Sequence, residues 1–139
     1  MHSAVMVVGG LCRAFAIARS YATVRSITVR NAQGNSGAQR LVETPLHMSV
    51  IAKVGTTYYA LVHLTFGAVA LLGKSECGTS NEDEERRLRL LIPAVKAFVS
   101  DKAVAAMEDC MACLGGQGYM EENVIGRYVV VFFDVICVA

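Results

Sequence analysis

Three glycines within four positions interrupt the second half of the chain. They stand in the segment Leu114-Gly115-Gly116-Gln117-Gly118-Tyr119, which follows a long stretch of helical periodicity. Glycine tolerates positive φ and lets a backbone approach another surface closely, so such a turn can end a helix or touch a ligand. A phosphate-binding loop normally precedes a helix, whereas these glycines follow one, and the Lys-Ser/Thr of a Walker loop is absent. Any diphosphate contact must therefore come from bare backbone amides, and on spacing alone this signal is weak.

Two further groups near the glycines have side chains that could do chemistry. Cys110-Met111-Ala112-Cys113 would place two thiols on one side of a helix, but no second pair or nearby His completes a zinc site. A redox role needs a thiolate, which a helix C-terminus disfavours, so we interpret both cysteines as small core residues. Glu121 and Glu122 are adjacent on a loop, and such carboxylates seldom converge on one atom. We predict neither a catalytic nor a metal-ligating residue.

Composition limits the class of protein. A chain of 139 residues is one domain in length, and its net charge of +1 gives no sign of a nucleic-acid interface. Apolar residues make up 54% and charged residues 18%, which indicates packing against partner chains or further domains. The odd number of cysteines favours a reduced intracellular compartment, without distinguishing the cytoplasm from the mitochondrial or peroxisomal matrix. They are Cys12, Cys77, Cys110, Cys113 and Cys137.

The first thirty residues show helical periodicity. Apolar side chains from Ala4 to Arg30 recur at three- and four-residue steps, which predicts a helix that Gly9 and Gly10 weaken in its first part. Four arginines without an acid also give this segment the composition of a mitochondrial transit peptide, but we favour the first helix of the domain. Residues 31 to 38 are rich in turn formers, so we predict a surface connection there.

A second helix is predicted to begin at Thr44-Pro45, which supplies an N-cap hydroxyl and a proline at the first helical position. It should end near Leu72, before a glycine. Lys53 is its only charged residue, which predicts a helix buried on nearly all sides. Residues 54 to 73 also have membrane-spanning length, but their hydroxyl and ring side chains favour the middle helix of a bundle. We interpret His63 as a core histidine, because no acid or Cys lies one turn away.

A third helix is predicted to begin within residues 80 to 89, where acids crowd the first turn and charged pairs follow at i,i+4 spacing. The pairs are Glu82 with Arg86, Asp83 with Arg87, and Glu85 with Arg89. An apolar stripe continues to Leu114, and Pro93 is expected to kink the helix. Residues 128 to 139 are β-branched and aromatic, which predicts a strand. A lone strand beside a helical bundle has no ladder to join, so this tail is locally inconsistent with the rest.

Several of these segments together resemble one known family. Leu114 to Tyr119, followed by Glu122 and Arg127, resembles the L-G-G-x-G-Y…E…R signature of the C-terminal helical domain of acyl-CoA dehydrogenases. Arg30-Asn31-Ala32-Gln33-Gly34 resembles the R-x-x-F-G turn of that family, with Gln33 in place of the aromatic residue. Glu43-Thr44-Pro45-Leu46 and Ile92-Pro93-Ala94-Val95-Lys96 are most similar to its alkylation-response branch. The resemblance covers roughly residues 5 to 127.

The resemblance implies an all-α, up-and-down helical bundle at residues 1–127, with residues 128–139 as a divergent and irregular hydrophobic tail. It also implies that subunits assemble as a homo-oligomer, or with full-length relatives, and hold FAD across an interface to oxidise an acyl-CoA substrate. The residues implied in cofactor binding are Arg30, Gly115, Gly116, Gln117, Gly118 and Tyr119. An Arg fork suits phosphate oxygens, and glycines permit close approach of a backbone.

The departures from the family pattern concern activity. The family's N-terminal helical domain and middle β-domain have no counterpart in this sequence, and the usual catalytic Glu would fall near Ala139. We therefore expect a fragment truncated at both ends, whose parent oxidises acyl-CoA thioesters with FAD as hydride acceptor and which is inactive alone. The alternative is a non-catalytic helical module that associates with full-length relatives through its apolar faces.

Overall fold

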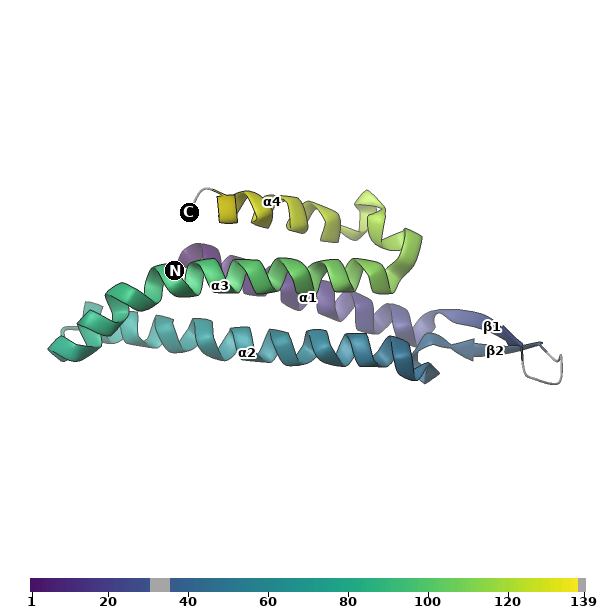
Figure 1. Cartoon of the computed structure of the whole chain (residues 1–139), viewed down its shortest axis with the longest axis horizontal. Helices are drawn as coiled ribbons and strands as arrows, with labels where there is room; N and C mark the ends of the chain where they lie inside the picture. Colours follow the sequence, from purple (N-terminus) through teal and green to yellow (C-terminus); the bar gives the residue numbers. More distant parts are fainter. Residues whose placement is uncertain (31–35, 138–139) are drawn as a thin grey trace.

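Four long helices dominate the computed structural model, which describes residues 1–30 and 36–137. They are α1 (His2–Val24), α2 (Pro45–Glu76), α3 (Glu82–Leu114) and α4 (Ile125–Cys137). Figure 1 shows α1, α2 and α3 lying along one another, with α4 along the side of α3, and successive helices running in opposite directions. The prediction of an all-α, up-and-down bundle is confirmed.

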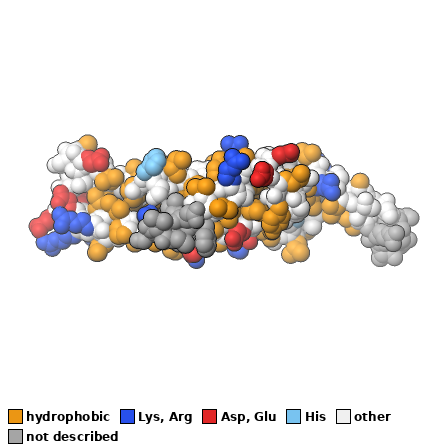
Figure 2. All heavy atoms as spheres, turned by 90° about the horizontal axis from the view of Figure 1, so that it is seen from above, with side chains coloured by type: hydrophobic (Ala, Val, Ile, Leu, Met, Phe, Trp, Pro, Cys, Tyr) orange, Lys and Arg blue, Asp and Glu red, His pale blue; other side chains and the backbone are white. Residues whose placement is uncertain are grey.

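The core lies where α1, α2 and α3 meet, and α4 closes one side of it. Its largest fully buried apolar side chains include Val7, Leu11, Val54, Val99, Met107 and Ile125. Apolar surface is not confined to this core: Figure 2 shows hydrophobic side chains along the whole length of the molecule on the face it presents. Because Val7 and Leu11 are among these buried side chains, the first helix belongs to the domain core, as the sequence predicts.

A β-hairpin, which was not predicted, connects α1 and α2. Strand β1 (Ser26–Arg30) pairs antiparallel with β2 (Ser36–Arg40), with Ser26 opposite Arg40, and the hairpin projects from the end of the bundle (Figure 1). The prediction that the first helix reaches Arg30 is wrong, because α1 ends at Val24. The β-branched run Ile27-Thr28-Val29 loses side-chain freedom in a helix and gains a hydrogen-bonded ladder here. Of the predicted surface connection, residues 31–35 lie outside the described residues.

Helix α2 begins at Pro45 as predicted, but the Thr44 hydroxyl at its N-cap makes no cap hydrogen bond, and the helix ends later than predicted. It continues through Gly73 to Glu76, and its C-cap is Cys77. The residue that stops it is Gly78, whose φ of +67° only glycine adopts without strain. Gly73 has no such conformation and is an ordinary helical residue.

The burial of α2 contradicts the sequence-based prediction. Its buried residues form one stripe that packs on α1 and α3: Ile51, Val54, Gly55, Leu61, Thr65 and Ala68. The opposite face is exposed and includes His63, so the interpretation of that residue as a core histidine is wrong. By length and composition α1 and α2 could each cross a membrane, although core helices of a soluble bundle meet the same criterion. The lack of charged residues in α2 indicates that the helix can be buried, but only the tertiary structure shows which of its faces is buried and against which helices.

Helix α3 begins with the charged segment identified in the sequence. The Asn81 side chain accepts a hydrogen bond from the Glu84 amide at 2.8 Å, and the Glu84 carboxylate accepts one from the Asn81 amide at 3.1 Å. This reciprocal pair is a capping box. The predicted pair of Glu82 and Arg86 forms at 2.6 Å. Pro93 lies inside the helix, whose first turns are inclined to the rest in Figure 1, consistent with the predicted kink.

The C-terminal segment is a helix, and the prediction of a strand is wrong. Within α4, Ile125 and Phe132 are buried while Val130 and Val131 are exposed, which is the periodicity of an amphipathic helix. The ring of Phe132 lies against Gly10 of α1 and stacks on Tyr128 at 5.8 Å between ring centroids. Burial of this apolar face outweighs the weak strand propensity of the segment.

Candidate functional site

The glycine segment forms a 3-10 turn, η2 (Gly115–Tyr119), which a second turn, η3 (Glu121–Asn123), connects to α4. Gly115 is the C-cap of α3, with a φ of +61°, and its amide donates to the Ala112 carbonyl. Gly118 is buried so close to the Met111 carbonyl that a Cβ there would overlap it. A Cβ on Gly116 would meet nothing within 4 Å. The fold therefore requires two of the three glycines and leaves Gly116 free.

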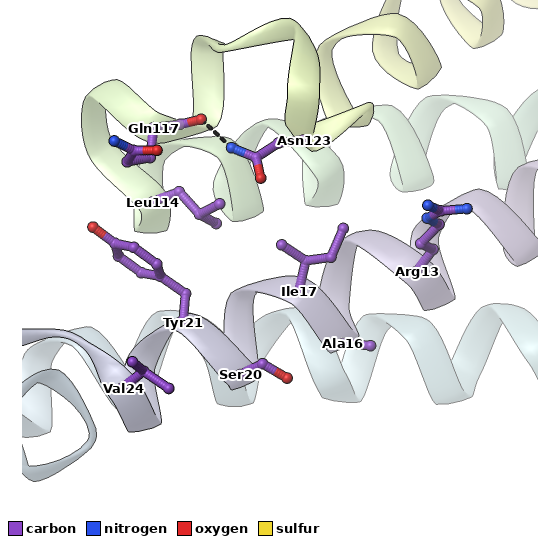
Figure 3. A pocket seen from close by; sticks show the side chains of 9 residues that line it. All are labelled: Arg13, Ala16, Ile17, Ser20, Tyr21, Val24, Leu114, Gln117 and Asn123. Carbon is purple, nitrogen blue, oxygen red and sulfur yellow. Dashed lines mark hydrogen bonds between the residues drawn. The ribbon is translucent and has the colours of Figure 1, made fainter.

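A groove of about 470 Å³ lies between α1 and this turn, and Figure 3 shows the side chains around it. We call it the α1 groove; it is lined by Arg13, Ala16, Ile17, Ser20, Tyr21, Val24, Leu114, Gln117 and Asn123. Its floor is apolar, with Ile17 and Leu114 facing each other, and Arg13 and Tyr21 lie toward its two ends (Figure 3). This combination suits a ligand with an apolar or planar body and an anionic group.

The turn is held in place from inside the groove. The side-chain amide of Asn123 donates to the backbone carbonyl of Gln117, shown as a dashed line in Figure 3. This bond connects η3 to η2. The backbone amide of Met120 donates a second hydrogen bond to the same carbonyl, at 3.3 Å. The groove wall that carries Gln117 is thus fixed to η3, the turn that leads into α4.

The six residues implied in cofactor binding do not all share one surface. Gln117 lines the α1 groove, whereas Tyr119, 74% exposed, lines a second hollow of about 500 Å³ together with Glu121 and Arg127. Arg30 ends β1, on the hairpin that leaves the same end of the bundle as the glycine turn (Figure 1). The structure therefore gathers the glycine turn and the hairpin at one end, and it turns the side chains of Gln117 and Tyr119 to different sides.

Sequence reasoning did not identify the α1 side of this groove. Arg13, Ile17 and Tyr21 follow one another at four-residue spacing, which puts them on one face of a helix. This spacing indicates a common helix face, but it does not show that the face lies opposite the glycine turn. Arg25 follows Val24 at the end of α1, is exposed, and forms no ion pair within the part of the chain that the structure describes.

The paired cysteines and glutamates show no sign of reactivity. Burial, followed by the nearby Cys113 and Asp109, raises the pKa of the Cys110 thiol to about 12. Burial and Asp109 also raise the pKa of Cys113, so both thiols stay protonated at neutral pH. Glu121 and Glu122 are exposed on η3, and no three His, Cys, Asp or Glu side chains within residues 1–29 and 36–132 gather as metal ligands.

Comparison with known proteins agrees with this architecture. The family model described as the acyl-CoA oxidase C-alpha1 domain matches residues 3–137. The chain is similar to acyl-CoA dehydrogenase family member 11 of Caenorhabditis elegans, with 34% identity over 123 residues. That alignment covers 88% of this chain and 18% of the relative, so the chain spans about a fifth of its length.

Solved structures show the same relationship. The crystal structure of Caenorhabditis elegans ACDH-11 in complex with C11-CoA superimposes with a TM-score of 0.81 and 32% identity, covering 97% of this chain and 21% of that one. Bd2924 in its apo form gives a TM-score of 0.79 and 26% identity, covering 96% of this chain and 24% of that one. From the helical bundle, the glycine turn and these matches, the chain belongs to the acyl-CoA oxidase and dehydrogenase family, of which it carries the C-terminal helical domain.

Proposed function

We propose that this chain supplies part of a flavin site in an acyl-CoA dehydrogenase-type assembly. In this proposal the end of the bundle that carries the glycine turn contacts the adenosine-diphosphate half of FAD held largely by a neighbouring subunit. Bound FAD would supply the hydride acceptor for oxidation of an acyl-CoA thioester. The matched relative ACDH-11 was solved with C11-CoA, which supports an acyl-CoA as the substrate of the parent enzyme.

The observation that carries the proposal is the open surface at Gly116. Gly115 needs positive φ and Gly118 needs contact with Met111, so the fold itself explains both. Gly116 has neither requirement, yet it is a glycine, and it lies between Leu114 and Gln117 of the α1 groove. A bare backbone next to a groove lets a diphosphate or a planar ring approach the main chain without a clash.

The charges near the groove fit a dinucleotide. Arg13 lines it and Arg25 lies next to Val24 at its hairpin end, and neither forms an ion pair among the described residues. Guanidinium groups bind phosphate oxygens with two parallel hydrogen bonds. Tyr21 adds an aromatic ring at one end of the groove, as Figure 3 shows. Arg13 and Arg25 would hold the phosphates, and Tyr21 would stack on a flat ring. Gln117, which lines the same groove, is the member of the six implied residues that would join them.

We expect no dehydrogenation by the chain alone. The residues that line the α1 groove include no carboxylate to remove an α-proton. The purified chain, mixed with FAD and then with acyl-CoA thioesters of several lengths, should leave the flavin absorbance at its oxidised level. Bleaching of the flavin by any acyl-CoA would show that the chain is catalytic by itself.

Binding is tested separately from catalysis. FAD and ADP are titrated into the chain by calorimetry, and the Gly116→Leu variant is compared with Gly9→Leu, an exposed glycine on α1 with equally open surroundings. We expect Gly116→Leu to weaken the binding of both ligands about tenfold or more and Gly9→Leu to leave it unchanged, since a clash of the leucine side chain with a bound ligand should cost about 1.4 kcal/mol or more. Equal affinity in both variants, or no binding of either ligand by the unmodified chain, would overturn the proposal.

The rival hypothesis, a non-catalytic module that associates with full-length relatives, makes a different prediction. Size-exclusion chromatography of the chain with and without FAD separates the two. Assembly that requires flavin supports a shared cofactor site, and association that ignores flavin supports the module.

A further inference from the structure

The second hollow, of about 500 Å³, lies between α3, α4 and the turns that join them. We call it the α4 hollow. Its apolar lining comes from Met111, Met120, Val129 and Val130, and the ring of Tyr119 lines it as well. Met120 is 46% exposed and Val130 is 62% exposed, so the bundle leaves this apolar surface uncovered. A space of this volume with a mainly apolar lining is typical of a binding site for a small molecule.

Two side chains of opposite charge line the α4 hollow. Glu121 lies on η3, and Arg127 lies in the first turn of α4. Both are exposed, and neither forms an ion pair with the other or with any charged group in residues 1–29 and 36–132, whose side chains the structure describes. A bound molecule that carries one cationic and one anionic group can therefore form an ion pair with each of them.

Gly126 leaves room for such a molecule. It lines the hollow, and a Cβ at this position would make only an ordinary contact of 3.8 Å with the methyl group of Met111. The fold therefore does not require a glycine here, although glycine lowers the stability of a helix relative to alanine. A larger side chain would extend from this position into the hollow. The absence of a side chain keeps the hollow open next to Arg127.

We propose that the α4 hollow binds a free α-amino acid with a large apolar side chain, such as phenylalanine. The carboxylate of the amino acid pairs with Arg127, where the first turn of α4 adds the positive end of its dipole. The ammonium group pairs with Glu121. The apolar side chain lies against Met111 and Val129, and the ring of Tyr119 is available for stacking.

Ligands with a single charge fit this hollow less well. A fatty acid would bring its carboxylate near Glu121, and the adjoining hollow, which shares Met111 with this one, adds Glu108 and Asp109. An apolar amine would bring its ammonium group near Arg127. In both cases a like charge in the hollow disfavours binding, so the two opposite charges select a zwitterion. A residue inside a peptide chain lacks both charged groups, which leaves the free amino acid.

Titration of the nitrogen-labelled chain with three probes, followed by nuclear magnetic resonance, tests this site. The probes are phenylalanine, phenethylamine, which lacks the carboxylate, and hydrocinnamate, which lacks the ammonium group. Phenylalanine should shift the amide signals of Gly126 and Arg127. It should also bind about fivefold or more tightly than either analogue, because each analogue loses one charged hydrogen-bonding group.

Substitutions at the two charged residues assign each group of the ligand to its partner. Arg127→Gln should bind phenylalanine no more tightly than phenethylamine, and Glu121→Gln should bind it no more tightly than hydrocinnamate. Glu122→Gln is the matched control, because Glu122 is an exposed neighbour on η3 that does not line the hollow. Gly126→Leu should weaken the binding of all three probes, and circular dichroism checks that each variant keeps the helical content of the parent.

Three results would overturn the inference: amide signals that phenylalanine does not shift, equal affinity for the three probes, or an equal loss of affinity in Arg127→Gln and Glu122→Gln. The site is independent of flavin. Arg127→Gln should therefore keep the affinity of the parent for FAD, and Gly116→Leu should keep its affinity for phenylalanine.

Discussion

The ring of Phe132 in α4 occupies the space that a side chain at Gly10 in α1 would fill. A Cβ built on Gly10 would lie 2.5 Å from Cε2 of Phe132 and 3.6 Å from the methyl group of Met107. Gly10 is buried and Phe132 is only 6% exposed, so the contact belongs to the core. A glycine that weakens the first helix when α1 is considered alone therefore creates the site where the last helix docks.

The first prediction concerns this contact. Gly10→Ala should destabilise the domain by about 1–3 kcal/mol, because the added methyl group overpacks the core and pushes Phe132 outward. Gly9→Ala, one residue earlier and with nothing within 4 Å, should be neutral or stabilising by about 0.5–1 kcal/mol. Urea unfolding followed by circular dichroism measures both. Equal effects of the two substitutions would show that α4 does not dock on Gly10.

The second prediction separates the glycines of the turn by stability. Gly118→Ala should cost about 2 kcal/mol or more, since its Cβ overlaps the Met111 carbonyl, and backbone cannot move aside as a flexible side chain can. Gly116→Ala should leave the unfolding midpoint within about 0.5 kcal/mol of the parent, as for an open surface position. The measurement is thermal unfolding of the two variants side by side. A large loss at Gly116 would mean that the fold, rather than a ligand, requires that glycine.

The third prediction concerns the start of α3. Asn81→Ala removes the acceptor for the Glu84 amide and should cost about 1 kcal/mol. Asn81→Ser keeps an oxygen at the cap and should retain most of the stability. If Ala and Ser behave alike in chemical denaturation, the capping box does not stabilise the domain.

The fourth prediction concerns pH. The hydrogen bond from Lys74, followed by the one from the Asn81 amide, lowers the pKa of Glu84 below its usual value of 4.5. A lowered folded-state pKa means that the stabilisation is present above pH 4.5 and is lost as the pH falls through the folded-state pKa. Glu84→Gln should therefore reduce the loss in free energy of unfolding that the parent shows as the pH falls below 4.5. Glu121→Gln, which replaces an exposed residue, should lose as much stability as the parent. If the stability of Glu84→Gln falls with acid as steeply as that of the parent, the ionised Glu84 carboxylate does not stabilise the fold.

The fifth prediction uses the raised thiol pKa values. With its pKa at about 12, Cys110 should resist iodoacetamide at pH 8, and Cys113 should react slowly, because alkylation requires the thiolate. Cys12 and Cys77 are exposed and should be labelled first, as read by mass spectrometry of the peptides. Rapid labelling of Cys110 in the folded chain would reopen a redox role for the pair.

Local signals in the sequence determined much of the fold. Thr44-Pro45 marked the start of α2, the acids after Asn81 marked the start of α3, and the glycines marked its end. Each of these signals acts within a turn of helix, so neighbouring residues suffice to predict it. The combination of the glycine turn with the upstream motifs also indicated the correct family, because such motifs depend on residue identity and spacing alone.

Tertiary contacts decided what local preference could not. Residues 128 to 137 have strand propensity, yet they form a helix because α1 and α3 offer Phe132 a place to bury its ring. The residues Ile27-Thr28-Val29 continue the helical periodicity of the sequence, yet they form a strand because β2 pairs with them. Composition could show that α2 avoids charge, but burial depends on neighbours, and among the described residues α2 packs mainly against α1 and α3 on one face. In the same way the spacing of Arg13 and Tyr21 places them on one face, while their position opposite the glycine turn depends on how α1 packs against α3.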